Sequence, residues 1–258
     1  MKLYWKFFAM HLKSRMAYKG SFLMSVLGQF LTSFTAFLTL TFMFDRFQAV
    51  KGYTIGDCML CSGVIVLSFA LAEMFFRSFD SFQGLVREAS LDRLMLRPRG
   101  LIFQVLCHQV EFGRLGVVLQ SFCMLGYGVA VSTVVWTAER IAVLILMIMG
   151  GTILFACLFV MHAAVCFFTI DSIEAFNILT YGAREYGGYP LDVYGGTVLK
   201  LCTYLIPYAL VQYYPLQFLL GRTDSLLCAL APLLAPLFAL PSYALWRLGV
   251  SKYQSAGS

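Results

Sequence analysis

The side chains that could carry out chemistry in this sequence are few and widely spaced. The three histidines are His11, His108 and His162, and Cys58 and Cys61 form the one close pair among the eight cysteines. A C-x-x-C pair without a second pair or a nearby histidine is a weak sign of metal or redox chemistry, so we interpret both cysteines as small packing residues. We therefore predict no metal site, no catalytic residue and no cofactor in this chain.

Motifs for nucleotide hydrolysis and for common hydrolases are absent. The sequence contains no Gly-Lys dipeptide, which a G-x-x-x-x-G-K-[ST] phosphate loop requires. It also contains no H-E-x-x-H or G-x-S-x-G motif. The chain is therefore not predicted to be an enzyme by itself. An intramembrane enzyme is the least favoured hypothesis, because no base and nucleophile occur at a recognisable spacing.

The composition is that of a protein embedded in a lipid bilayer. Hydrophobic residues make up 60% of the chain and charged residues 12%, whereas soluble domains carry roughly a quarter charged residues. A spanning helix needs about 20 apolar residues. We predict an all-α integral membrane protein with one transmembrane domain over residues 1–258. The six predicted spans lie at about 20–44, 57–76, 112–135, 141–168, 199–220 and 226–248.

The flanks of these spans predict their orientation. Residues 1–19 combine apolar residues at helical spacing with lysines, which predicts an amphipathic helix lying in the lipid headgroup layer. Basic residues concentrate in segments 1–19 and 77–100, so both termini are predicted to be cytoplasmic. The other basic residues assigned to the inner side are Arg184, Lys200, Arg247 and Lys252, whereas the outer loops hold only Arg46, Lys51, Arg140 and Arg222. The net charge of +6 is explained by attraction to anionic lipid, and no nucleic-acid partner is needed.

The first predicted cytoplasmic loop covers residues 77–100. Phe79, Phe82, Leu85 and Val86 recur at helical spacing with charged residues on the other side, which predicts a short amphipathic helix. The sequence up to Pro98 adds a second apolar patch. We favour a docking element over a plain solvated loop, because a plain loop would need neither the aromatic face nor the second patch.

The second predicted cytoplasmic loop covers residues 169–198. Asp171 can cap a helix in which Glu174 takes the third position and Asn177 shares the same face. This acidic face could contact a soluble partner, and the alternative is ordinary loop polarity. Pro190, after a Gly-Gly-Tyr turn, suits the first position of the next helix and marks a hinge.

Two prolines interrupt the predicted fifth span. Pro207 and Pro215 each remove a backbone donor from residues 199–220. Prolines in a membrane helix are tolerated where neighbouring groups satisfy the freed carbonyl. We interpret both as marks of a bend or a gate.

Ionisable residues near the spans offer an alternative function. Glu111 and Arg114 are three residues apart and are predicted to form a structural ion pair on one helix face, in preference to a substrate contact. An ion-coupled secondary transporter could use Glu73, Glu111, Arg114 or His162. We favour this less, because these residues cluster near the inner boundary and leave the midplane nearly free of charge.

Several motifs together resemble a known transporter family. They are Leu91-Asp92 with Leu96-Arg97-Pro98, Asp171-Ser172-Ile173-Glu174 with Asn177, Tyr189-Pro190-Leu191 with Tyr194, and Ile206-Pro207 with Tyr213-Tyr214-Pro215. With six spans and a basic amphipathic N-terminus, the chain resembles the permease subunit of a type-2 ABC exporter. The similarity is to the compact six-span subfamily that has a separate ATPase.

The resemblance implies a partner-driven mechanism. Two copies of a P-loop ATPase, which carry ATP and Mg, would drive two permeases, identical or homologous, in a bacterial cytoplasmic membrane. Alternating access would export a hydrophobic or amphiphilic compound such as a drug, lipid, peptide or natural product. The residues implied to form coupling helices against the ATPases are Gln83, Leu85, Arg87, Leu91, Asp92, Leu94, Asp171, Glu174 and Asn177.

Overall fold

The computed structural model describes residues 2–47, 49–88, 90–169 and 174–253, and within these ranges the regular structure is helical. The α-helices are α1 (Lys2–Met16), α2 (Lys19–Arg46), α3 (Ile55–Asp80), α4 (Phe82–Arg87), α5 (Ser90–Met95), α6 (Leu101–Leu106), α7 (Leu115–Val131), α8 (Ala138–Val165), α9 (Glu174–Asn177), α10 (Ala183–Tyr186), α11 (Gly196–Tyr204), α12 (Tyr208–Val211), α13 (Tyr213–Leu219), α14 (Leu226–Leu230) and α15 (Ala239–Lys252). The shorter helical turns are η1 (Phe112–Arg114), η2 (Ile178–Gly182), η3 (Leu191–Tyr194) and η4 (Ala231–Phe238).

Five helical segments of the described chain are long and apolar enough to cross a membrane. They are Lys19–Arg46, Ile55–Arg87, Phe112–Val131, Ala138–Val165 and Leu226–Lys252. These coincide with five of the six spans predicted from the sequence. The multi-pass membrane protein expected from composition is therefore confirmed.

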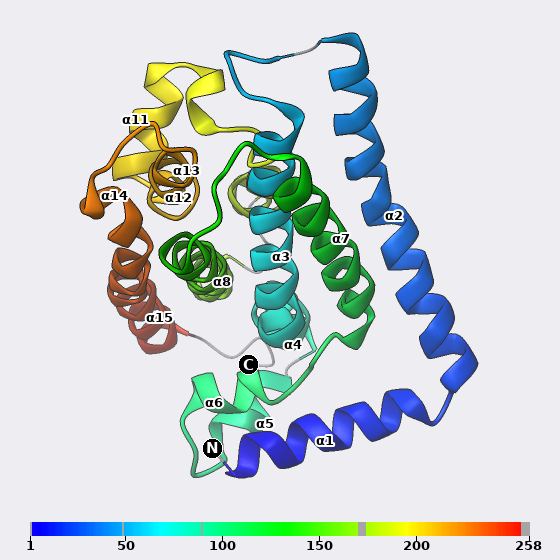
Figure 1. The fold of residues 1–258 in the computed structure, drawn as a ribbon. Coiled ribbons are helices and arrows are strands. Elements are labelled where there is room, and N and C mark those ends of the chain that lie inside the picture. The colour runs from blue at the N-terminus through cyan, green and yellow to red at the C-terminus, as the bar shows by residue number, and fades with distance from the viewer. Residues whose placement is uncertain (1, 48, 89, 170–173, 254–258) are drawn as a thin grey trace.

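Helix α3 is the centre of the bundle. In its most apolar stretch 83% of the residues are buried inside the protein, whereas in α2 the share is 11%. Helices α7 and α8 pack along α3, and α2 lies on the outer side of α7 (Figure 1). We name the two ends of this bundle after residues at the ends of α3: the Tyr53 end and the Asp80 end.

Local sequence explains where the central helices start and how closely they pack. The side chain of Thr54 caps the N-terminus of α3 in a reciprocal arrangement with Asp57. Gly63 and Gly128 lie where α3 and α7 cross, and a Cβ atom on Gly128 would come within 2.9 Å of the Leu60 backbone nitrogen. Small residues at such crossings allow membrane helices to approach closely.

Helix α1 runs across the Asp80 end of the bundle (Figure 1). Its Phe8 packs against Phe75 of α3 and Phe112 of η1, with ring centroids 6.2 and 5.0 Å apart. This apolar contact holds α1 against α3 and η1. The position of α1 in a lipid headgroup layer stays a prediction.

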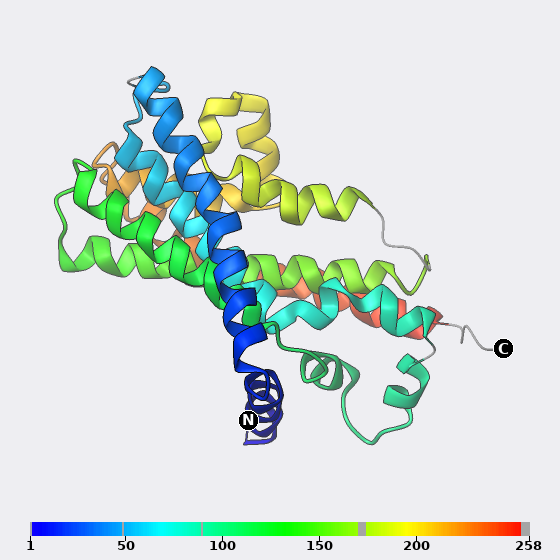
Figure 2. The same cartoon turned by 90° about the vertical axis from the view of Figure 1, so that its right-hand side faces the viewer.

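The segment after α8 differs from the sequence-based prediction. Tyr181 donates a hydrogen bond to Asp80 at 2.7 Å, and Asp192 accepts one from Tyr53 at 2.9 Å. These partners lie at opposite ends of α3, whose 26 residues extend about 39 Å. Residues 181–192 therefore run alongside α3 from the level of Phe69 toward the Tyr53 end instead of forming one loop at the Asp80 end, and Figure 2 shows this segment returning alongside α8.

The predicted span at about 199–220 is also different. It consists of α11, α12 and α13, three short helices separated by breaks, with Pro207 capping α12 and Pro215 in the first turn of α13. Hydrogen bonds from Gln217 to Tyr53 and from Arg222 to the Gly52 carbonyl hold the end of this segment at the Tyr53 end. An apolar stretch of sufficient length thus folds back on itself, because its prolines interrupt helical hydrogen bonding.

Candidate functional site

A buried ionic cluster lies at the Asp80 end of α3. Glu73, whose side chain is fully buried, accepts hydrogen bonds from Arg77 at 3.0 Å, from Tyr181 at 3.2 Å and from Arg114. Asp80 accepts bonds from Arg77 at 2.6 Å and Tyr181 at 2.7 Å. Two carboxylates and two guanidinium groups therefore compensate one another away from water. The cluster joins α3 to η1 and to η2.

The cluster has further members that the sequence did not reveal. Arg114 donates to Gln29 of α2 at 2.9 Å. His162 Nδ1 lies 4.0 Å from the Asp80 carboxylate, and its ring stacks on Phe176 with centroids 5.7 Å apart. His162 has no acidic neighbour along the chain, and Asp80 comes close only after α3 and α8 pack together. No residue spacing signals such a contact.

The predicted ion pair between Glu111 and Arg114 is replaced by two other pairs. Arg114 bonds Glu73, and Glu111 lies 3.5 Å from Arg15 of α1. Glu111 has φ −99° and ψ 86° and accepts a bond from the Gly113 backbone, so it caps η1 and is outside the helix. The i, i+3 rule applies only when both residues are helical.

Helices α4 and α5 form a compact foot at the Asp80 end. Three predicted coupling residues, Leu85, Leu91 and Leu94, are 6%, 0% and 9% exposed and belong to the main hydrophobic core. They attach the foot to the bundle and are not available to a partner. The foot surface carries exposed Arg87 and Arg93.

The remaining predicted coupling residues have mixed surroundings. Gln83 and Asp92 are half-buried, and Asp92 accepts a hydrogen bond from Tyr253 at 3.0 Å. Asn177 is half-buried in α9, which begins at Glu174. Asp171 lies outside the described residues. Of the predicted coupling residues in the second loop, Asn177 therefore lies at the end of α9, shortly before the segment that runs along α3.

A polar cavity of about 170 Å³ lies halfway along the bundle, between α2, α3 and α10. Arg184 of α10 places its guanidinium 5.8 Å from the ring of Phe69. Phe69 is near the midpoint of α3, and its neighbour Ser68 packs against Gly151, near the midpoint of α8. The Arg184 guanidinium is therefore level with the middle of α3 and α8. The expectation of a midplane nearly free of ionisable residues left out Arg184 and Glu185, because it placed residues 169–198 in a cytoplasmic loop.

Comparison with known proteins decides the family. A family model described as "ABC-2 family transporter protein" matches residues 30–257. The chain belongs to the ABC-2 transporter family. No curated protein and no solved structure matches it. The chain is thus a membrane permease of an ABC transporter, a transport subunit and not itself an enzyme, and this family associates with an ATP-binding partner.

The predicted hinge prolines of the permease surround one buried amide. The side-chain nitrogen of Gln212 lies 2.6 Å from the Gly187 carbonyl and 2.9 Å from the Tyr189 carbonyl. Gln212 lies between Pro207 and Pro215, and both carbonyls come shortly before Pro190. The amide therefore ties the folded-back helices to the segment that runs along α3. A gating role for the three prolines stays a prediction.

The Tyr53 end of the permease is closed by a polar network. Gln217 donates to the Tyr53 hydroxyl at 2.6 Å, and the Arg222 guanidinium lies 4.0 Å from the centre of the Tyr53 ring. Lys51 donates to the Asp192 carbonyl at 2.9 Å. Burial raises the pKa of Tyr53 above its ordinary value, and the hydrogen bond to Asp192 raises it further. The hydroxyl therefore remains protonated and donates to Asp192.

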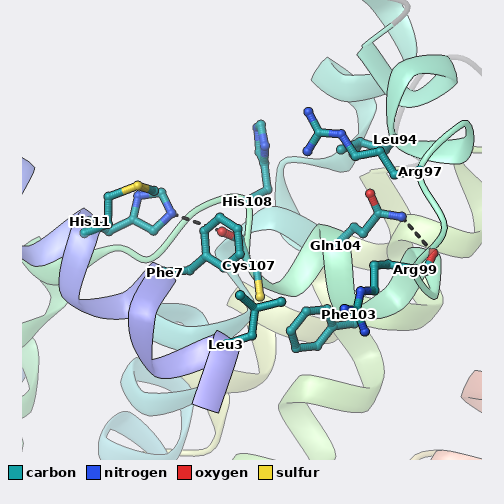
Figure 3. Close-up of a pocket in the computed structure, with 11 residues that line it drawn as sticks. Leu3, Phe7, His11, Leu94, Arg97, Arg99, Phe103, Gln104, Cys107 and His108 are labelled. Atoms are coloured by element: carbon teal, nitrogen blue, oxygen red, sulfur yellow. Dashed lines mark hydrogen bonds between the residues drawn. The ribbon is translucent and has the colours of Figure 1, made fainter. Parts of the chain in front are cut away.

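A second cavity joins α1 of the permease to the foot. Its volume is about 270 Å³, and Figure 3 shows Phe7 of α1 facing Cys107 next to α6. The imidazole Nε2 of His11 lies 3.0 Å from the Cys107 carbonyl oxygen. Burial lowers the pKa of His108, and the electrostatic influence of nearby His11 lowers it further. The cavity therefore brings His11 of α1 and His108, which follows α6, onto one wall.

Proposed function

We propose that this permease is the membrane half of an ATP-driven exporter and that its foot is the contact for the ATPase. Two P-loop ATPase subunits, carrying ATP and Mg, would work with two permeases, identical or homologous. The cargo would be a hydrophobic or amphiphilic compound. The membrane would be a bacterial cytoplasmic membrane with both termini and the Asp80 end inside.

The direct connection between α3 and the foot is the observation that supports this proposal best. The foot follows α3 directly, and Phe79 and Phe82 pack on Trp246 with ring centroids 5.5 and 5.4 Å apart. Phe76 has the non-helical angles φ −109° and ψ 18°, which kink α3 just above the foot. A push on the foot is therefore transmitted through α3 to the ionic cluster and to residues 181–192.

The test compares two charge reversals at opposite ends of the permease. Arg93 is exposed on the foot between buried Leu91 and Leu94, and Arg46 is exposed at the end of α2 near Tyr53. The purified permease is expected to hydrolyse no ATP alone and to gain activity when its ATPase is added. Arg93→Glu is expected to weaken binding of the ATPase and to lower that activity, whereas Arg46→Glu leaves both unchanged. Equal activity of both variants with the ATPase would contradict the proposal.

An ion-coupled secondary transporter is the second candidate. The mid-membrane position of Arg184 and Glu185 favours it, because ionisable residues at that depth often belong to ion pathways. The pairing of Glu73 with two arginines speaks against a role for Glu73 in carrying protons. Transport by the isolated permease in liposomes under a proton gradient, without ATPase, would support this second candidate.

A further inference from the structure

The cavity at mid-membrane depth contains a charge that the permease only partly compensates. The side chain of Glu185 is 75% exposed, and its carboxylate lies 3.7 Å from Nε of Arg184. The Arg184 side chain is 19% exposed and is held over the ring of Phe69. A largely exposed carboxylate at this depth is costly in lipid and requires a partner of opposite charge.

The polar groups around Glu185 favour a positively charged partner. The cavity is lined by Thr35, Ala36, Thr39, Leu40, Ser62, Val66, Arg184, Glu185, Gly188 and Tyr189. The hydroxyls of Thr35 and Thr39 donate to carbonyl groups of their own helix, at 2.6 and 2.8 Å. Their free lone pairs, like the carboxylate of Glu185, can only accept hydrogen bonds. An ammonium or similar cation supplies the matching donors or charge.

An apolar stripe adjoins this cavity. Leu31, Leu38 and Phe42 of α2 are 64%, 37% and 67% exposed. Together with Thr35 they are spaced four, three and four residues apart, so they share one helix face. A molecule with its positive charge at Glu185 would thus find a surface for apolar groups beside it. The cavity of about 170 Å³ holds a charged head group and not a whole drug-sized molecule.

We propose that Glu185 binds the positive charge of the cargo, so that the permease selects amphiphilic cations. The assignment rests on the proposed transport function and adds the class of substrate to it. Arg184 partly compensates the charge of Glu185 and repels a cation that approaches from the Phe69 side. The two residues therefore have opposite effects on affinity for a cation.

Equilibrium binding of two probes of one shape and opposite charge tests this assignment. Decyltrimethylphosphonium and decyltrifluoroborate, which each carry a small charged head group on the same apolar chain, are titrated, without ATP, into the permease–ATPase complex in nanodiscs of phosphatidylglycerol. Glu185→Gln is expected to weaken binding of the phosphonium at least about tenfold, the equivalent of 1.4 kcal/mol, and to leave borate binding unweakened. Arg184→Gln is expected to bind the phosphonium at least as tightly as the unmodified permease. Glu139→Gln, at the exposed start of α8, serves as the matched control.

Three outcomes would overturn the assignment. They are unchanged phosphonium affinity in Glu185→Gln, equal loss of affinity for both probes, and loss of phosphonium affinity in Arg184→Gln. A tenfold weaker affinity in nanodiscs containing phosphatidylethanolamine would assign the site to a lipid ammonium group in place of cargo. Binding is measured without ATP, so its result does not depend on transport. A complex that binds the cation but does not transport it would contradict the proposed function and would still support the binding site.

Discussion

Glu73 shows at the scale of one residue how this permease tolerates charge within a helix bundle. Its carboxylate is fully buried and accepts bonds from two guanidinium groups and one hydroxyl. Removing one partner of a buried charge pair leaves the other charge uncompensated, which costs more than the pair itself contributes. The cluster is therefore sensitive to single substitutions.

The first prediction concerns Glu73→Gln. We expect the free energy of unfolding to fall by about 3–5 kcal/mol, because Arg114 loses the carboxylate that compensates it and Arg77 is left with Asp80 alone. The measurement is denaturant unfolding in detergent micelles. The control is Glu139→Gln, which removes an exposed acid from the first turn of α8 and is expected to cost at most about 1 kcal/mol. Equal losses in the two variants would show that the cluster does not stabilise the fold.

The second prediction compares two glycines of α7. In Gly128→Ala the new methyl group would lie 2.9 Å from the Leu60 backbone nitrogen, and we expect a loss of about 1–3 kcal/mol from overpacking. In Gly126→Ala nothing lies within 4 Å of the new methyl group, and we expect a gain of up to about 1 kcal/mol. Unfolding in micelles measures both. A destabilised Gly126→Ala together with an unaffected Gly128→Ala would contradict the packing of α3 on α7.

At the scale of elements, hydropathy predicted the five long spans well, because each contains enough apolar residues to be recognised by length alone. The segment along α3 could not be found in this way. It carries Arg184 and Glu185 and is interrupted by the turn at Gly187 and Gly188. Conversely, residues 199–220 have the right length and hydropathy, yet their prolines divide them. The aromatic spacing of the foot correctly predicted a helix there. The aromatic residues, however, lie on the face that packs against the bundle and not on the face open to a partner.

The third prediction tests the path of residues 181–192. In a cysteine-free background, Arg97→Cys and Asp192→Cys are expected to react with a membrane-impermeant maleimide from opposite sides, whereas Lys51→Cys reacts from the same side as Asp192→Cys. The reason is that Asp192 is bonded to Tyr53 and Lys51, at the far end of α3 from the foot. Labelling of right-side-out and inverted vesicles measures this. Reaction of Arg97→Cys and Asp192→Cys from the same side would show that residues 169–198 form one cytoplasmic loop, as predicted from the sequence.

The ionic cluster connects the foot, which would receive force from the ATPase, with residues 181–192, which would move. Tyr181 bonds Glu73 and Asp80, the two carboxylates of the ionic cluster, and packs edge-on against Phe69 with ring centroids 5.1 Å apart. It is thus the link between the helix that ends in the foot and the segment that carries the mid-membrane cavity. Loss of its hydroxyl would remove that link and keep the ring packing.

The fourth prediction is that Tyr181→Phe uncouples transport from ATP hydrolysis. We expect the complex in proteoliposomes to keep most of its ATPase activity, because the foot remains packed on the bundle. The amount of cationic dye moved per ATP is expected to fall about fivefold. A fall of this size corresponds to the loss of one or two hydrogen bonds of roughly 0.5–1.5 kcal/mol each. Tyr204→Phe removes a hydroxyl from a tyrosine that is 86% exposed and is expected to leave the ratio unchanged. If Tyr181→Phe lowers hydrolysis and transport in equal proportion, the cluster contributes to assembly with the ATPase and does not transmit motion to the cavity.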